Sequence, residues 1–138
     1  NNSNKIAMSL SDLFCVERHK KQFLDLVENK LDIVFANEQE ILSLISSKSF
    51  NDAVSYAKSL NKTMVITRGE KGALSINDGK TVEFPAQSNL KIIDLTGAGD
   101  LFAAGYLHGL INKMSIKQSL AKGTELSSKI IQKIGARI

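Results

Sequence analysis

The sequence predicts an α/β fold in which a mainly parallel sheet is covered by helices. Apolar runs at residues 31–36 and 63–67 have the continuous hydrophobicity of strands that are buried on both faces. Helical segments alternate with these runs in the order β-α-β-α-α-β, which is typical of parallel sheets. The length of 138 residues, 43% of them hydrophobic, fits one domain with a sizeable core.

Polar caps and apolar spacing place the first elements along the chain. Asn37 is suited to cap a helix whose first turn carries Glu38 and Glu40, because acidic groups favour helix N-termini. Asn51 or Asp52 is suited to open the next helix. The expected elements are a strand at 5–10, a helix at 16–29, a strand at 31–36, helices at 37–46 and from 51 or 52 to 60, and a strand at 63–67.

A hairpin and two long helices are expected in the second half. Asp78-Gly79 separates two alternating runs, which predicts a β-hairpin near residues 73–84. A short strand at 91–94 follows, and then helices at 98–112 and 115–134. The first of these helices is apolar on nearly all sides, which predicts a buried element in which His108 is a packed core or interface residue.

Composition and charge exclude several classes of protein. No apolar run approaches the roughly 20 residues that a membrane span needs. The lone cysteine, Cys15, excludes an internal disulfide and a cysteine-based zinc cluster, and it favours a reducing cytoplasm. The chain opens on Asn1-Asn2-Ser3-Asn4 without Met or a signal-peptide pattern, so we expect a piece of a longer protein.

The net charge of +4 is concentrated late in the chain. Six basic residues and one acidic residue follow position 100. Such a face favours either solvent or a nucleic acid. Because no aromatic side chains interleave with the lysines, we expect no nucleic-acid partner.

The segment at residues 94–102 carries the strongest chemical signal. Gly97, Ala98 and Gly99 join a short strand to an apolar helix and leave bare backbone N–H groups at the helix N-terminus, where an anion is favoured. Asp100 follows in the first turn, from which a carboxylate can accept the proton of a hydroxyl that attacks phosphorus. The alternative is a glycine-rich turn in which Asp100 only serves the helix dipole.

Two familiar phosphate-binding motifs are excluded. Gly79-Lys80-Thr81 lies in the expected hairpin and lacks the first glycine of a P-loop, since position 74 is Leu74. A dinucleotide fingerprint starting at Gly97 would need a small residue where Phe102 stands.

Two further segments follow buried strands, at the sheet edge where α/β proteins bind ligands. Asn37 can orient a phosphate oxygen, and Glu40 can hold a hydrated Mg²⁺. The alternative for both residues is a helix cap with first-turn acids. The glycines of the segment at residues 67–72 permit a ligand to approach the backbone, and the alternative there is an ordinary β-turn.

Together these segments resemble the ribokinase-like (PfkB) family of carbohydrate and nucleoside kinases. Residues 94–100 are similar to its C-terminal signature, Asn37-x-x-Glu40 to its metal and phosphate element, and Thr67-x-Gly69-x-x-Gly72 to its nucleotide turn. Residues 11–19 and 134–137 look most like adenosine-kinase-type members. The resemblance implies a three-layer α/β/α Rossmann-like fold.

The resemblance also implies transfer of the ATP γ-phosphoryl group to a sugar or nucleoside hydroxyl, with Mg²⁺. The chain would be the C-terminal nucleotide-binding portion, residues 1–138, without the acceptor-binding half and lid, and with little activity alone. A homodimer of the longer protein is compatible with the family. The alternative function is a nucleotide-binding module without catalysis. The implied roles are the catalytic base for Asp100, the anion hole for Gly97, Ala98 and Gly99, ATP binding for Thr67, Gly69, Gly72, Thr96 and Asn37, and Mg²⁺ binding for Glu40.

Overall fold

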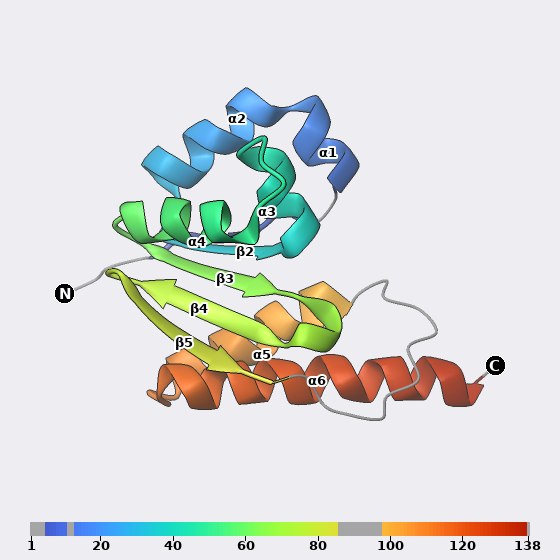
Figure 1. Ribbon diagram of the computed structural model, residues 1–138. Helices are drawn as coiled ribbons and strands as arrows, with labels where there is room; N and C mark the ends of the chain where they lie inside the picture. The colour runs from blue at the N-terminus through green and yellow to red at the C-terminus, as the bar shows by residue number, and fades with distance from the viewer. Residues whose placement is uncertain (1–4, 11–12, 86–97, 138) are drawn as a thin grey trace. The chain divides into compact units, whose positions relative to one another are not determined.

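The computed structural model describes residues 5–10, 13–85 and 98–137. Within these ranges, five strands form one sheet in the order β1-β2-β3-β4-β5 (Figure 1). The strand expected at residues 91–94 lies outside the described residues. The strands are β1 (Ala7–Ser9), β2 (Ile33–Asn37), β3 (Thr63–Thr67), β4 (Ala73–Asn77) and β5 (Lys80–Phe84).

The first three strands are parallel, as the sequence predicts. β1 pairs with β2 and β2 pairs with β3, with Phe35 opposite Val65 in the centre of the second pair. Asp32 fixes the start of the first pairing, because its carboxylate Oδ2 accepts the N–H of Ile6 at 2.8 Å. Parallel strands bring their carboxyl ends to one edge of the sheet, which is where ligand-binding loops follow.

The predicted hairpin is confirmed. β4 and β5 run in opposite directions in Figure 1 and are joined by Asp78 and Gly79 alone. Both residues have positive φ, 52° and 77°, which is the type I′ geometry that matches the twist of the flanking strands. Asp-Gly is one of the residue pairs that adopt this turn at low cost.

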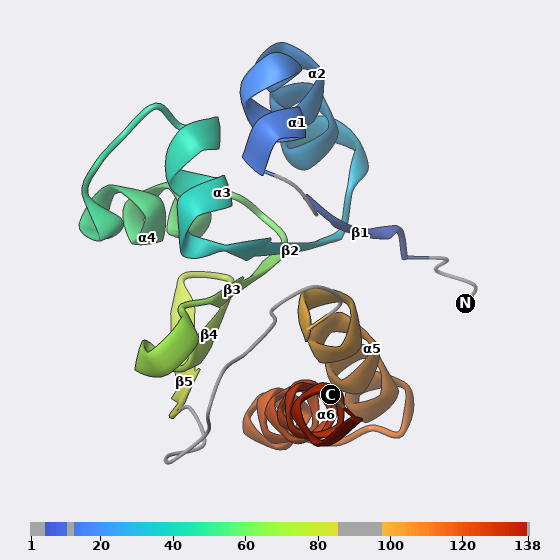
Figure 2. The ribbon, with the colours of Figure 1, turned by 90° about the vertical axis from the view of Figure 1, so that its right-hand side faces the viewer.

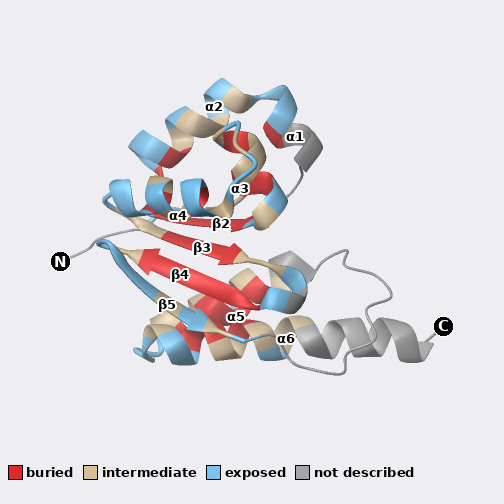
Figure 3. Cartoon of the chain, viewed as in Figure 1, coloured by how far each residue is buried: buried red, intermediate tan, exposed pale blue. Residues whose placement is uncertain are grey.

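The chain divides into two compact units, residues 1–67 with 75–81 and residues 68–74 with 82–138. In the first unit, the helices lie on one face of β1 to β3 (Figures 1 and 2). Figure 3 shows that β2 and β3 are almost wholly buried. The helices of this unit are α1 (Leu13–Arg18), α2 (Lys20–Asp25), a π-helical turn (Leu26–Lys30), α3 (Glu38–Leu44) and α4 (Phe50–Ser59).

Two of the expected helices differ from the structure. The expectation of one helix at residues 16–29 is wrong, because the backbone leaves the helical region at His19, with φ −123° and ψ 40°. The helix expected to open at Asn51 or Asp52 begins at Phe50 instead. Its N-cap is Ser49, whose N–H donates to the Ser47 hydroxyl at 3.1 Å.

A hydrogen bond between side chains ties α4 to the π-helical turn. The Tyr56 hydroxyl donates to Glu28 Oε2 at 2.8 Å. Burial raises the pKa of Tyr56, and the hydrogen bond to the Glu28 carboxylate raises it further. The phenol therefore keeps its proton, and this link persists, over the physiological pH range.

The second unit contains an antiparallel helix pair, α5 (Ala98–Ile111) and α6 (Ile116–Arg137), whose helices lie side by side in Figures 1 and 2. A capping box starts α6, because Ser115 N donates to Gln118 Oε1 at 2.9 Å and Gln118 N donates to Ser115 Oγ at 3.1 Å. Its buried residues include Phe102 and Tyr106 on α5 and Ser119 and Leu120 on α6.

Small residues line the contact between α5 and α6. A Cβ on Gly105 would lie 2.7 Å from Gly123 Cα, and a Cβ on Gly123 would lie 2.7 Å from the Phe102 carbonyl oxygen. A Cβ on Gly109 would lie 2.8 Å from Ser119 Cα. Residues spaced by four on each helix thus let the two backbones approach more closely than larger side chains allow.

The prediction that α5 is buried on nearly all sides is wrong for this chain, and so is the prediction that His108 is packed in its core. That His108 lies at an interface stays a prediction. Phe102 and Tyr106 are buried, but Ala104 and His108 are exposed. The glycine spacing decides which face meets α6, and His108 lies off that face. Its backbone carbonyl accepts the Asn112 side-chain amide at 2.8 Å near the end of the helix.

In the described ranges, none of the helices combines the length and the hydrophobicity that crossing a membrane requires.

We predict that Gly105→Ala lowers the free energy of unfolding by about 1–3 kcal/mol, because the added methyl overlaps the α6 backbone. This loss outweighs the gain of about 1 kcal/mol in helix propensity. Urea denaturation measures the difference. The exposed Ala104→Ser serves as the control on the same helix, and a Gly105→Ala chain as stable as the wild type would contradict the close contact.

Candidate functional site

Two of the predicted binding residues lie side by side at the carboxyl edge of the sheet. Asn37 ends β2, Thr67 ends β3, and the two residues are direct partners in the parallel pairing. Asn37 is exposed and Thr67 is half-buried, so a ligand at this edge can reach both residues. This pairing follows from the two apolar runs, because the residues directly before Asn37 in β2 and Thr67 in β3 are buried.

Asn37 and Glu40 form a capping box at the start of α3. Asn37 Oδ1 accepts the N–H of Glu40 at 2.8 Å, and Glu40 Oε1 accepts the N–H of Asn37 at 2.9 Å. The structure therefore contains the helix cap that the sequence offered as the alternative role. The amide Nδ2 of Asn37 takes no part in this cap, which leaves a hydrogen-bond donor at the sheet edge.

The geometry of Glu40 fits a hydrated cation better than direct coordination. Its side chain is buried, with a relative exposure of 5%, and one carboxylate oxygen is held by the cap. A carboxylate held in this way can still accept hydrogen bonds from the waters that Mg²⁺ usually keeps. Among the described residues, no group of three or more histidine, cysteine, aspartate or glutamate side chains could hold a metal ion.

The segment after β3 is a tight turn that depends on glycine. Gly69 and Gly72 have φ of 58° and 93°, a region that other residues rarely adopt. The Arg68 N–H donates to the Gly72 carbonyl at 2.7 Å, which closes the turn around the 3₁₀ segment Gly69–Lys71. A Cβ at Gly69 would meet nothing within 4 Å, so backbone conformation accounts for this glycine and packing does not.

The predicted catalytic segment is described only in part. Thr96 and Gly97 lie outside the described residues. Ala98, Gly99 and Asp100 form the first turn of α5, as the sequence predicts for an anion-binding helix start. The first N–H groups of a helix have no partner within the helix.

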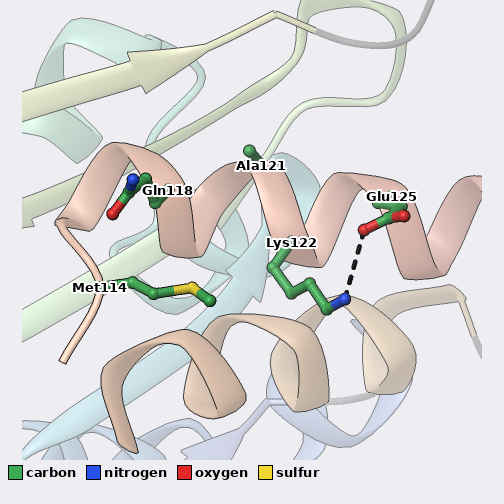
Figure 4. A pocket seen from close by; sticks show the side chains of 5 residues that line it. All are labelled: Met114, Gln118, Ala121, Lys122 and Glu125. Atoms are coloured by element: carbon green, nitrogen blue, oxygen red, sulfur yellow. Dashed lines mark ion pairs between the residues drawn. The ribbon is translucent and has the colours of Figure 1, made fainter. Parts of the chain in front are cut away.

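A separate hollow lies against α6, and none of the predicted site residues lines it. It has a volume of about 270 Å³ and is shown in Figure 4. Lys122 Nζ lies 3.4 Å from Glu125 Oε1 beside it. The residues that line it are Met114, Gln118, Ala121, Lys122 and Glu125.

None of the residues predicted for the site belongs to the small-residue contact of α5 with α6. Gly105 and Gly109 belong to none of the motifs that the sequence indicates. The signal that could have found it is the spacing of four in both helices, Gly105 to Gly109 and Ser119 to Gly123.

We predict that Asn37→Ala lowers the free energy of unfolding by about 0.5–2 kcal/mol, because it removes the cap oxygen from the Glu40 N–H. Asn37→Asp keeps an oxygen in the same place and should retain most of the stability. Thermal and urea unfolding of both variants test this. Asn51→Ala, at an exposed position in the first turn of α4, is the control, and an Asn37→Ala loss no larger than the control loss would argue against the cap.

Comparison with known proteins identifies relatives along nearly the whole chain. The family described as pfkB family carbohydrate kinase matches residues 1–138. The chain is 34% identical over 119 residues to the cytidine kinase of Thermococcus kodakarensis, which covers 84% of this chain and 42% of that protein. It is 31% identical over 151 residues to the adenosine kinase of Schizosaccharomyces pombe, covering 99% of this chain and 44% of that protein.

Solved structures agree with the sequence relatives. A probable sugar kinase from Rhizobium etli superposes with a TM-score of 0.89 at 37% identity, and the adenosine kinase of Sinorhizobium meliloti with 0.87 at 35%. Each match covers 94% of this chain and 40% of the solved chain, so the chain spans less than half the length of these relatives. The predicted ribokinase-like α/β fold is confirmed, and the chain belongs to the pfkB family of carbohydrate kinases.

Proposed function

We propose that this chain is the nucleotide-binding portion of an ATP-dependent kinase that phosphorylates a hydroxyl of a sugar or nucleoside. Family membership over residues 1–138 carries this proposal. It is supported by the β2–β3 register, which pairs Asn37 with Thr67 at the sheet edge where α/β proteins bind ligands. The relatives are kinases named for cytidine, ribose and adenosine, so the class of acceptor is assigned by analogy.

In this proposal each segment has its own task toward the nucleotide. The Nδ2 group of Asn37 and the Thr67 hydroxyl donate hydrogen bonds to phosphate oxygens, since both end neighbouring strands. The turn with Gly69 and Gly72 lets the backbone approach ATP without a side chain between them. Thr96 contributes to the same binding, by resemblance to the family.

The chemical step is assigned to the start of α5. Asp100 accepts the proton of the acceptor hydroxyl as its oxygen attacks the γ-phosphorus, and the bond from that phosphorus to the β–γ bridging oxygen breaks, releasing ADP. The N–H groups of Gly97, Ala98 and Gly99 stabilise the negative charge on the transferring group. A helix start is suited to this task because its dipole adds positive potential.

Mg²⁺ would neutralise phosphate charge when bound, and Glu40 is the residue proposed to hold its waters. The capping box fixes the Glu40 carboxylate through Asn37 N, so the group is oriented before a ligand arrives. Asn37 and Glu40 are therefore assigned both a structural and a ligand-binding role.

The chain alone is proposed to bind ATP weakly and to turn over little substrate, because it spans less than half the length of its relatives. A cytoplasmic location agrees with its single cysteine. Pairing of two longer chains into a homodimer stays a prediction.

We predict that Asp100→Asn, in a full-length enzyme that carries this chain, lowers kcat on the order of 10²–10⁴-fold by removing the general base. Binding of ATP should persist, because the N–H groups of the helix start are unchanged. Steady-state kinetics and nucleotide titration measure the two effects separately.

Asp78→Asn is the matched control for this experiment, since Asp78 is exposed at the hairpin tip and Asn also adopts positive φ there. A normal turnover rate in Asp100→Asn would remove Asp100 from its role as the base. A full-length wild type that binds ATP but transfers no phosphoryl group would favour the nucleotide-binding module without catalysis.

We also predict that Glu40→Gln weakens binding of MgATP on the order of tenfold, the loss expected when one charge-assisted hydrogen bond is removed. Binding of ATP without Mg²⁺ should change little, because the glutamine oxygen can still accept the Asn37 N–H and keep the cap. Titration with and without Mg²⁺ separates the two cases. Equal weakening under both conditions would show that Glu40 acts only as part of the cap.

A further inference from the structure

At the contact between α5 and α6, neither helix leaves room for a side chain larger than that of glycine. At Gly105 an added Cβ would lie 2.7 Å from Gly123 Cα and 2.7 Å from the Lys122 carbonyl oxygen, both of them backbone atoms. At Gly123 it would lie 2.7 Å from the Phe102 carbonyl oxygen. Backbone atoms cannot rotate away as the ends of side chains can. The two helices can therefore pack this closely in only one relative position along their contact.

A second observation concerns the other end of the same contact, where Ser119 of α6 faces Gly109 of α5. Ser119 is fully buried, and its Oγ has no hydrogen-bond partner among the residues that the structure describes. This hydroxyl occupies the space where a Cβ of Gly109 would lie. An unpaired buried hydroxyl costs free energy, so hydrogen bonding does not account for its position. What the side chain does there is to fill the gap left by glycine and to limit how far α5 can slide along α6.

We infer that Gly105, Gly109, Ser119 and Gly123 are positioning residues that hold α5 in place and thereby set the position of its first turn. The inference rests on the proposed function, in which that turn carries the anion-binding N–H groups and Asp100. Gly105 lies five residues after Asp100 on one continuous helix, about 7.5 Å along its axis. A shift forced at the contact with α6 therefore moves the first turn as well.

The expected loss of rate depends on how precisely the reacting groups must be placed for phosphoryl transfer. A misplacement of about 1 Å far from the reacting atoms can cost on the order of 10²-fold in rate. Nucleotide binding depends on the same turn less strongly, so a loss of affinity on the order of tenfold is expected.

The experiment uses four variants of the chain, each labelled for NMR and titrated with MgATP. Gly109→Ala forces the helices apart, and Ser119→Gly removes the opposing side chain. The double variant removes the two side-chain atoms that lie nearest the new methyl group and leaves only the contact with the Cα of residue 119, at 2.8 Å. His108→Ala is the control, since His108 is exposed and adjoins Gly109 on the same helix. Urea unfolding confirms that each variant is folded under the titration conditions.

We expect Gly109→Ala to shift the amide resonances of Gly99, Asp100 and Leu101 and to raise the Kd for MgATP on the order of tenfold. The double variant should reverse at least half of both changes, and His108→Ala should cause neither. A merely structural role would lower stability but leave the Kd and these amides unchanged in the folded protein. That result would overturn the inference.

Ser119→Gly gives an independent answer if Gly109→Ala does not fold. It loosens the same contact, so the three amides should shift and MgATP should bind a few-fold more weakly. Unchanged amides and affinity in this variant would overturn the inference. If the wild-type chain shows no binding of MgATP, the proposed function fails. The amide shifts of Gly99, Asp100 and Leu101 in the variants then decide whether the contact with α6 positions the first turn of α5.

Discussion

The parallel pairing of β2 with β3 is the constraint on which the candidate site depends. Its register places Asn37 opposite Thr67, so the ends of two buried strands fall at the same point of the sheet edge. Buried apolar side chains enforce that register, since a slip of one residue would turn them to the other face. The capping box after β2 therefore starts beside the last residue of β3. In the proposed function, this pairing lets Asn37 and Thr67 reach the same nucleotide.

In the proposed function, the capping box lets one pair of residues serve both stability and ligand binding. Asn37 and Glu40 satisfy each other's backbone N–H groups, which fixes both side chains before any ligand is present. A group that is already ordered loses little entropy on binding. The structural alternative and the ligand-binding role are therefore compatible, and the charge of Glu40 is what separates them experimentally.

Much of the fold follows from local sequence signals. The parallel strands were predicted from continuous apolar runs and the hairpin from Asp78-Gly79, because both signals act over a few residues. The break at His19 could not be predicted, since no proline or glycine marks it. The exposed position of His108 was also missed, because the face that α5 presents depends on contact with α6. In the site, the order of the motifs indicated Asn37, Glu40 and Thr67. That the Glu40 side chain accepts the Asn37 N–H could be seen only in the structure, because the sequence allowed a helix cap or a metal-binding residue at this position.

Titration of the uniformly ¹⁵N-labelled chain with MgATP tests the central claim most directly. The account predicts saturable shifts of amide resonances in three segments, residues 37–40, 67–72 and 97–101, while the hairpin tip at residues 78 and 79 stays unchanged. Saturable binding that instead perturbs only the residues around the α6 hollow, between 114 and 125, would contradict the account.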